Sequence, residues 1–307
     1  MVPSINKNTI IGIGLAIAAA IIWSGNFIVA KTAATTIPPV MLSFLRWFFA
    51  TVLITPFAWK KYQKERHIVW QNKSYFFFTA FTGFTCYNVF LYIAGHYTSA
   101  INLALIGSLS SPIFAVAIGA IFFKEQVPLV RIIGLVLCVI GILILIAKGS
   151  FARLKAFHFE IGDLLSIVGG LCFAIYNNLA KRKPKGISSI NFLFVGFCIG
   201  TSLLFPTMVI EHILQPKPLP ITLSVVGTIA YLSIGCSFLA YLFWNQSIHL
   251  IGPSRAVLFG NLIPIFSTIE AVILLGEPLT NIHLISGLIV LVGLIIANIT
   301  FKKLAKN

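Results

Sequence analysis

Charge is scarce in this sequence, since only 9% of its 307 residues are charged. Acidic residues are the rarest of these, with Asp163 as the one aspartate beside six scattered glutamates. Enzymes that build a two-metal or acid–base centre need clustered carboxylates, so no such centre is expected. There is no Walker A motif for ATP, and the five cysteines show no CxxC or Cys/His spacing. We therefore predict no metal, no disulfide, no cofactor and no direct ATP coupling within this chain.

Hydrophobic residues make up 58% of the chain, more than a soluble domain of this size can bury. A bilayer core about 30 Å thick requires roughly 20 apolar residues per helical span. The connections, the longest at about 60–73 and 148–160, are too short for a separate catalytic domain. The sequence predicts ten spans, at about 9–30, 38–59, 74–95, 99–123, 129–147, 161–180, 189–210, 222–244, 254–275 and 282–301.

The net charge of +15 would suggest nucleic-acid binding in a soluble protein, but the positions of the cations exclude that interpretation. If the N-terminus is cytoplasmic, 16 of the 22 Lys and Arg residues lie in cytoplasmic connections and termini and five lie outside. This asymmetry follows the positive-inside rule, although three of the outer cations fall in one segment, KGSFARLK at 148–155. We expect a multi-pass protein of the cytoplasmic (inner) membrane with both termini in the cytoplasm, and with the lipid bilayer rather than nucleic acid as its partner.

The sequence contains an internal repeat. SSPIFAVAIGAIFFKEQ at 110–126 and LIPIFSTIEAVILLGEP at 262–278 align at an offset of 152 residues. The same offset places Pro112 on Pro264 and Glu125 on Glu277. Each half, 1–150 and 151–307, would hold five spans, and because five is odd the second half enters the membrane from the opposite side. The predicted fold is an all-α integral membrane protein of ten transmembrane helices in two inverted five-helix repeats, which form one transport unit.

Several segments resemble the EamA family of the drug/metabolite transporter superfamily. They are WSGNFIVAK at 23–31, FLRW at 44–47, the Pro112 to Glu125 segment, and AYLFWNQSIHLIGPSRA at 240–256 leading into Pro264 and Glu277. The resemblance covers essentially the whole chain. It implies two inverted repeats around a central cavity lined mainly by the first, third, fourth, sixth, eighth and ninth helices. The sequence departs from the family pattern at Ser286, which aligns with Gly134 of the first half, and at Glu270, where the family usually has a small or apolar residue.

The leading hypothesis is a secondary transporter that exports or exchanges small organic metabolites, with amino acids or related amphipathic compounds as the expected substrates, by alternating access. The alternative is an integral membrane enzyme such as a prenyl or phosphate transferase, which the scattered carboxylates disfavour. A passive channel is disfavoured by the absence of charged rings or filter-like repeats.

Polar and aromatic residues inside the spans are candidates for substrate contact, because a buried amide must find a partner in a neighbouring helix or a ligand. Asn26 and Asn177 are equally consistent with cavity contact and with helix packing. Trp244 is more typical of an anchor at the membrane interface. In the third span we expect Phe77, Phe81 and Phe84 to face lipid. The candidate substrate-binding residues are Trp23, Asn26, Tyr87, Asn88, Tyr176, Asn177 and Trp244.

The repeated residues favour structural roles. Pro112 and Pro264 each remove a backbone hydrogen bond within a predicted span, which kinks a helix or frees a carbonyl for a ligand. Glu125 and Glu277 fall at predicted helix ends, where a cap or an ion pair is the more common role.

Two charges lie inside predicted spans, Arg46 in the second and Glu270 in the ninth. Both are about five or six residues from the outer face, hence at one depth. A charge near mid-membrane costs on the order of 2.5–3.5 kcal/mol, and such acids usually face the bundle interior. We expect Glu270 to face the cavity and either to pair with Arg46 or to bind the proton or cationic group that transport exchanges. A fixed structural pair, or a neutral carboxyl, is the alternative.

Overall fold

The computed structural model describes residues 7–150, 152, 160–251, 259–260 and 262–298, and all regular structure in this part of the chain is helical. The first half contains α1 (Lys7–Thr32), η1 (Ala33–Thr35), α2 (Pro39–Gln71), α3 (Lys73–Ala80), η2 (Phe81–Cys86), α4 (Tyr87–Ala94), α5 (Ala100–Phe123) and α6 (Leu129–Ile146). The second half contains α8 (Ile161–Lys181), α9 (Ser189–Leu214), α10 (Leu223–Ala230), η3 (Tyr231–Leu239), α11 (Ala240–Ile251), α13 (Ile263–Leu275) and α14 (Asn281–Asn298).

Within the described residues, seven helices are long and apolar enough to cross a membrane, and three shorter apolar helices accompany them. The shorter three are Leu129–Leu145, Ile263–Leu275 and Asn281–Ala297. The segments α3, η2 and α4 follow one another as a single span, Lys73–Ala94, and α10, η3 and α11 likewise provide the span Leu223–Ser247. Each of the ten predicted segments overlaps one of these helices; the start of the ninth, 254–258, lies outside the described residues.

Helix α2 is longer than expected. The segment 60–71, predicted as part of a connection, continues the helix to Gln71. Its charged residues favour helix as much as apolar ones do, so polarity marks the membrane boundary and not the helix end. At about 1.5 Å per residue, its 33 residues span roughly 50 Å, more than the hydrocarbon core requires.

The helix ends repeat in the two halves at the offset of 152. Helix α5 ends at Lys124 in the left-handed conformation, and the Glu125 N–H then bonds to the Gly119 carbonyl at 3.0 Å. Helix α13 ends in the same way at Gly276, with the Glu277 N–H bonding to the Ala271 carbonyl at 3.3 Å. The repeat in sequence is therefore also a repeat in local backbone structure.

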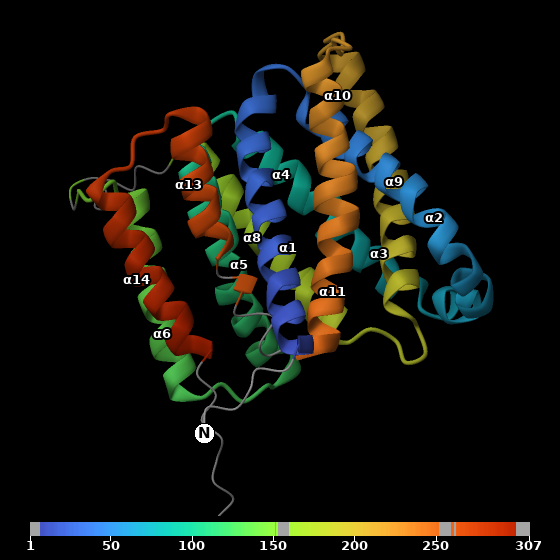
Figure 1. Ribbon diagram of the computed structural model, residues 1–307, viewed down its shortest axis with the longest axis horizontal. Coiled ribbons are helices and arrows are strands. Elements are labelled where there is room, and N and C mark those ends of the chain that lie inside the picture. Colours follow the sequence, from blue (N-terminus) through green and yellow to red (C-terminus); the bar gives the residue numbers. More distant parts are fainter. Residues whose placement is uncertain (1–6, 151, 153–159, 252–258, 261, 299–307) are drawn as a thin grey trace, which may run out of the picture.

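The paired helices of the two halves pack in matching ways. Helix α6 lies along α14 and α2 along α9, at opposite sides of the view in Figure 1. Helix α1 packs on α11 and α13, and its counterpart α8 packs on α4 and α5. Exchanging the two halves maps the α6–α14 and α2–α9 pairs onto themselves and the contacts of α1 onto those of α8.

Glycine contacts give the direction of α6 against α14. A Cβ at Gly134 would lie 2.4 Å from the Gly293 carbonyl oxygen, and one at Gly141 would lie 2.9 Å from the Ser286 carbonyl oxygen. Since the partner number falls as the residue number rises, the two helices are antiparallel. The offset of 152 converts Gly134 to Ser286 and Gly141 to Gly293, so each contact becomes the other when the halves are exchanged. The backbones of α6 and α14 can approach this closely only because the glycines at the contact have no side chains.

Two carboxylates join α2 and α9 reciprocally. Glu211, near the end of α9, accepts hydrogen bonds from the Val40 and Met41 backbone N–H groups at the start of α2, at 3.0 and 2.8 Å. Glu65, near the end of α2, accepts one from the Ser188 N–H at the start of α9, at 2.9 Å. Each acid caps the free N–H groups and the positive dipole end of the other helix, which requires an antiparallel pair.

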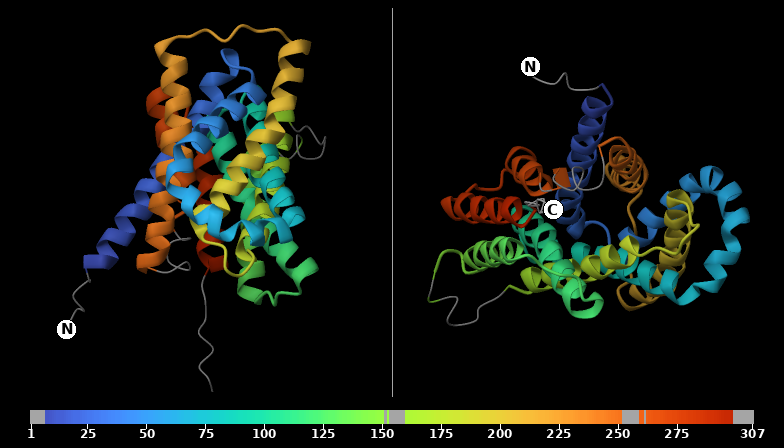
Figure 2. Two further views of the ribbon diagram at one scale, coloured as in Figure 1. Left: turned by 90° about the vertical axis from the view of Figure 1, so that its right-hand side faces the viewer. Right: turned by 90° about the horizontal axis from the view of Figure 1, so that it is seen from below.

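The connections fall at two ends of the bundle. The Lys217 ammonium donates to the Thr35 carbonyl at 2.6 Å, which places the 215–222 connection beside the end of α1. Glu125 meets Lys181 at the other end of the bundle. Figure 2 shows the start of α1 at one end and the connection between α9 and α10 at the other.

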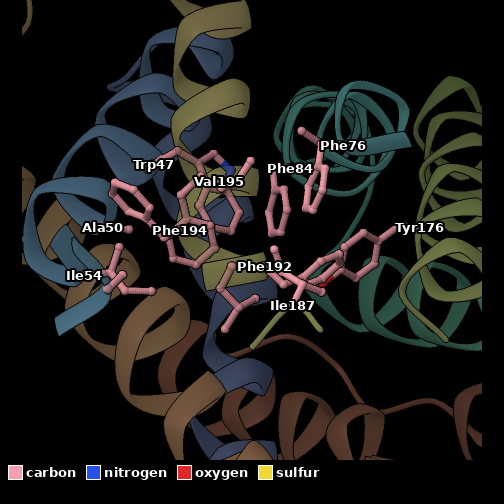
Figure 3. Packing of buried hydrophobic residues seen from close by; sticks show 14 of the residues in the cluster. Trp47, Ala50, Ile54, Phe76, Phe84, Tyr176, Ile187, Phe192, Phe194 and Val195 are labelled. Atoms are coloured by element: carbon pink, nitrogen blue, oxygen red, sulfur yellow. The ribbon is translucent and has the colours of Figure 1, made fainter. Parts of the chain in front are cut away.

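A cluster of aromatic residues fills the space between α2, α9, η2 and α8 (Figure 3). Phe84 packs against Trp47, Tyr176 and Phe197, with ring centroids 4.9–5.2 Å apart. The expectation that Phe84 faces lipid is wrong, because its side chain is fully buried, whereas Phe77 and Phe81 are exposed. The physical reason is the π-helical geometry of η2, whose wider turns shift the register of an α-helical face.

Candidate functional site

Arg46 lies at the centre of a buried polar cluster. Its Nε donates to Ser237 Oγ at 2.9 Å. Its Nη1 donates to Asn26 Oδ1, Asn88 Oδ1 and the Tyr92 hydroxyl at 3.0, 2.9 and 2.8 Å. The guanidinium also lies 4.8 Å from the centre of the Trp47 ring. All of these contacts are with neutral groups, and only 4% of Arg46 is exposed.

Four helical segments build the Arg46 cluster, which we define as Arg46, Asn26, Asn88, Tyr92 and Ser237. Arg46 comes from α2, Asn26 from α1, the pair Asn88 and Tyr92 from α4, and Ser237 from η3. Asn88 and Tyr92 are four residues apart and therefore share one face of α4. The Tyr92 hydroxyl donates to Asn26 Oδ1 at 3.0 Å, which links α4 to α1 directly.

Glu270 lies inside the bundle on α13, beside α1. The Ser24 hydroxyl donates to Glu270 Oε1 at 2.6 Å. The other oxygen, Oε2, is enclosed and receives no hydrogen bond from the described residues. A buried acceptor without a donor is unfavourable, so a proton or a bound cation would satisfy this oxygen.

Arg46 and Glu270 contact opposite faces of the same helix. Their partners Asn26 and Ser24 are two residues apart on α1, a rotation of about 200° and a rise of about 3 Å. The contacts of the two charges therefore lie at similar heights along α1, but α1 separates them by on the order of 10 Å, its diameter with side chains. In the described part of the chain no ion pair within 4.0 Å joins Glu270 to Arg46. Of the two expected arrangements, direct pairing is absent from this structure.

The predicted aromatic residues form two groups. On one side, Trp23 lies 5.4 Å from Tyr241 and 5.3 Å from Trp244 between ring centroids, and its Nε1 donates to the Cys236 carbonyl. Trp244 therefore packs on α1 in addition to lying near a helix end.

On the other side, Phe173 of α8 stacks on Tyr87 at 4.6 Å and on Tyr176 at 5.6 Å. Trp23 lies in α1 and Phe173 in α8, so each half provides an aromatic side chain from its first helix.

The two asparagines of α8 have different surroundings. Asn177 is exposed, and its amide lies 3.5 Å from Ser111 Oγ on α5. Asn178 is buried and donates to the Ala115 carbonyl at 3.0 Å, so it joins α8 to α5.

The repeated Pro and Glu residues contact structural elements. Pro112 lies inside α5, but Pro264 lies in the first turn of α13, where a missing N–H breaks no helix bond, so its predicted place within a helix is wrong for the described residues. Glu277 accepts from the Ala100 and Ile101 N–H groups at 2.8 and 3.1 Å and thereby caps α5.

Glu125 forms ion pairs at the end of α8. Its carboxylate accepts a hydrogen bond from the Lys181 ammonium at 2.8 Å and pairs with Arg182 as well. The hydrogen bond from Lys181, with the positive charge of both residues, lowers the pKa of Glu125.

Two hollows are present beside the described helices. A groove of about 420 Å³ between α5 and α6 is lined by ten hydrophobic residues, which include Ile113, Leu135 and Ile140, and offers no polar group to orient a ligand. A smaller cavity of about 170 Å³ lies between α2, α9 and α11, and Ser237 of the Arg46 cluster is among its lining residues. Ligand pockets usually measure about 300–1,000 Å³, so the cavity beside Ser237 is smaller than a usual ligand pocket.

Sequence reasoning did not select Ser24, Tyr92 or Ser237. Tyr92 follows Asn88 by one helical turn, so spacing could have suggested Tyr92, whereas Ser24 lies two residues before Asn26, on the opposite face of α1, and had no such signal. Ser237 had no such signal, because its contact with Arg46 depends on the packing of η3 against α2.

The fold and these buried polar clusters define a multi-pass integral membrane protein. The model of the EamA-like transporter family matches residues 10–147 and 160–299, so the chain belongs to this family.

Related proteins carry transporter names. The chain is 28% identical over 215 residues to the uncharacterized transporter YyaM of Bacillus subtilis, covering 69% of this chain and 68% of that protein. It is 24% identical to a probable amino-acid metabolite efflux pump of Salmonella typhimurium, over 94% of this chain and 95% of the relative. A solved crystal structure with 18% sequence identity has the same fold, with a TM-score of 0.61 over 95% of this chain and 96% of the other.

Proposed function

We propose that this protein is a secondary transporter that exports or exchanges small organic metabolites, with amino acids or related amphipathic compounds as the substrate class. Family membership supports transport, and the names of the relatives in Salmonella typhimurium and Escherichia coli support amino-acid metabolites. Two ionisable side chains inside the bundle, Arg46 and Glu270, carry the proposal, because intramembrane charges usually mark substrate or ion pathways. An enzymatic function gains no support from the family or from the relatives.

The architecture we propose is ten transmembrane helices in two inverted repeats. The antiparallel pairs α6–α14 and α2–α9 support it, because the offset of 152 exchanges the two members of each pair. A two-fold axis that exchanges two antiparallel helices runs across them, and thus in the plane of the membrane. Such a repeat lets one site open to either face by the same motion in reverse.

For orientation, we propose that both termini are in the cytoplasm of a cell whose cytoplasmic membrane holds the protein. The positive-inside asymmetry supports this choice. Single cysteines placed at 60–73 or 181–185 of a cysteine-free variant should resist an impermeant thiol reagent on intact cells, whereas those at 96–99 or 276–281 should react. Labelling of the 60–73 segment from outside would reverse the assignment.

Glu270 is the coupling group in this proposal. Its unsatisfied Oε2 can take a proton or a cation without rebuilding the Ser24 contact, which uses Oε1. Arg46 lies on the other face of α1, so a movement of α1 changes the environments of Arg46 and Glu270 together. Binding of a proton or cation at Glu270 and binding of a ligand at Arg46 are then linked by a free energy of coupling.

Reconstitution tests the proposal. Purified protein in liposomes should take up one or more labelled amino acids from a panel of metabolites, and an imposed pH gradient should change the uptake. Empty liposomes and the Arg46→Ala variant are the controls. If no compound of the panel enters faster than into empty liposomes, the proposal for this substrate class fails.

A further inference from the structure

All seven acidic side chains of the chain have partners away from Arg46. Three cap helices: Glu65 at the start of α9, Glu211 at the start of α2 and Glu277 at the start of α5. Glu125 and Glu160 form ion pairs with Lys181 and Lys148. Asp163 accepts a hydrogen bond from Thr98, and Glu270 from Ser24.

Within the described residues, Arg46 therefore has no counter-ion among the acidic side chains. Arginine stays charged in proteins, so deprotonation does not relieve the buried charge. The oxygen atoms of Asn26, Asn88, Tyr92 and Ser237 carry only partial negative charge, and a buried charge compensated by dipoles alone is costly.

The hydrogen bonds also leave part of the cluster available. Arg46 uses Nε and Nη1, and no hydrogen bond to a described residue is made by Nη2. Asn26 contributes Oδ1, while its Nδ2 has no partner among the described residues. Ser237 accepts from Arg46 and lines the cavity between α2, α9 and α11.

We infer that the Arg46 cluster is an anion site that binds the carboxylate of the transported molecule. Guanidinium and carboxylate match in shape and charge, and Nη2 of Arg46 with Nδ2 of Asn26 would supply the donors. This inference rests on the proposed function and names the substrate class as organic carboxylates. Because the cavity beside Ser237 is small, the carboxylate reaches Arg46 when the surrounding helices separate.

An internal counter-ion provides the sharpest test. In Asn26→Asp, the new carboxylate keeps the acceptor contacts with Arg46 and Tyr92, and the lost Nδ2 makes no hydrogen bond to a described residue. The new carboxylate neutralises Arg46 from within and competes with a bound carboxylate. Asn72→Asp, at the end of α2, adds the same charge far from the cluster and is the matched control.

Binding is measured on the detergent-solubilised full chain, through the shift in melting temperature caused by each standard L-amino acid and by its carboxamide. The expected result is that the wild type binds one or more amino acids with an affinity at least tenfold higher than that for the corresponding amides. Asn26→Asp should lose this preference while its ligand-free melting temperature is kept or raised, and Asn72→Asp should retain it.

The inference is overturned if amino acid and amide bind the wild type equally, if no amino acid shifts its melting temperature, or if Asn26→Asp keeps the full preference. Should Asn26→Asp fail to fold, Arg46→Gln and Arg46→Lys provide the comparison, with the preference expected only in the lysine variant. The transport assay is separate: a carboxylate preference in binding without uptake into liposomes would refute the transport function and leave the anion site standing.

Discussion

Removing the hydroxyl of Ser24 should move the pH dependence of transport. The Ser24 hydroxyl lies 2.6 Å from Glu270 Oε1 and 2.6 Å from the Ile21 carbonyl oxygen of its own helix, and its hydrogen bond to Glu270 is strongest when the carboxyl group is ionised. In Ser24→Ala the ionised Glu270 carboxylate loses this donor, while the protonated carboxyl group loses less hydrogen-bond energy. Proton binding at Glu270 therefore becomes more favourable in the variant.

The size of the effect follows from the strength of the bond. A hydrogen bond to a charged group contributes about 1.5–3 kcal/mol, and one pH unit corresponds to about 1.4 kcal/mol. The midpoint of the transport-against-pH curve should thus rise by about one to two pH units. Uptake into proteoliposomes, measured from about pH 5 to 9 with equal pH on both sides, gives this midpoint.

Ser43→Ala is the matched control. Ser43 is also fully buried, and its hydroxyl bonds to the Pro39 carbonyl of its own helix as that of Ser24 does to the Ile21 carbonyl, but within the described residues it contacts no carboxylate. The midpoint of the transport-against-pH curve of Ser43→Ala should stay within a few tenths of a pH unit of the wild-type midpoint. A Ser24→Ala protein that transports normally with an unshifted midpoint would refute the assignment of Glu270 as the titrating group.

The packing of the halves leads to two further predictions. Gly134→Ala places a Cβ 2.4 Å from backbone atoms of α14 and should lower stability by about 1–3 kcal/mol, seen as a lower melting temperature in detergent, whereas Gly227→Ala, with no atom within 4 Å, should not be destabilised. Cys86 of η2 and Cys172 of α8 are neighbours where these two segments pack together, so a membrane-permeant oxidant should join the halves through a disulfide. With a protease site inserted between α6 and α8, the cut halves should run together on a non-reducing gel and separately in Cys86→Ser; separate migration in both proteins would contradict this packing.

Much of the architecture could be predicted because it depends on local properties of the chain. Long apolar runs locate the spans, and the repeated Pro112 and Pro264 segments locate the two halves, since both signals are contained in contiguous residues. The matching left-handed ends at Lys124 and Gly276 follow the same offset. The end of α2 could not be read in this way, because charged residues support a helix in water as well as a loop.

The candidate site was predictable only in part. Depth along the spans indicated that Arg46 and Glu270 share a level, but hydropathy contains no information about which face of α1 each one meets. The burial of Phe84 depends on the π-helical turns of η2, and the caps formed by Glu65 and Glu211 depend on how α2 and α9 pack. These features arise from tertiary packing, for which a single sequence has no periodic signal.

Glu270→Gln tests the central claim, coupled transport through a carboxylate inside the bundle, most directly. The substitution preserves the shape of the side chain and its acceptor for Ser24 but removes titration. In proteoliposomes the variant should retain exchange of labelled for unlabelled substrate across the membrane, while accumulation driven by an imposed pH gradient is lost. Gradient-driven accumulation with the wild-type rate and pH profile would contradict the claim.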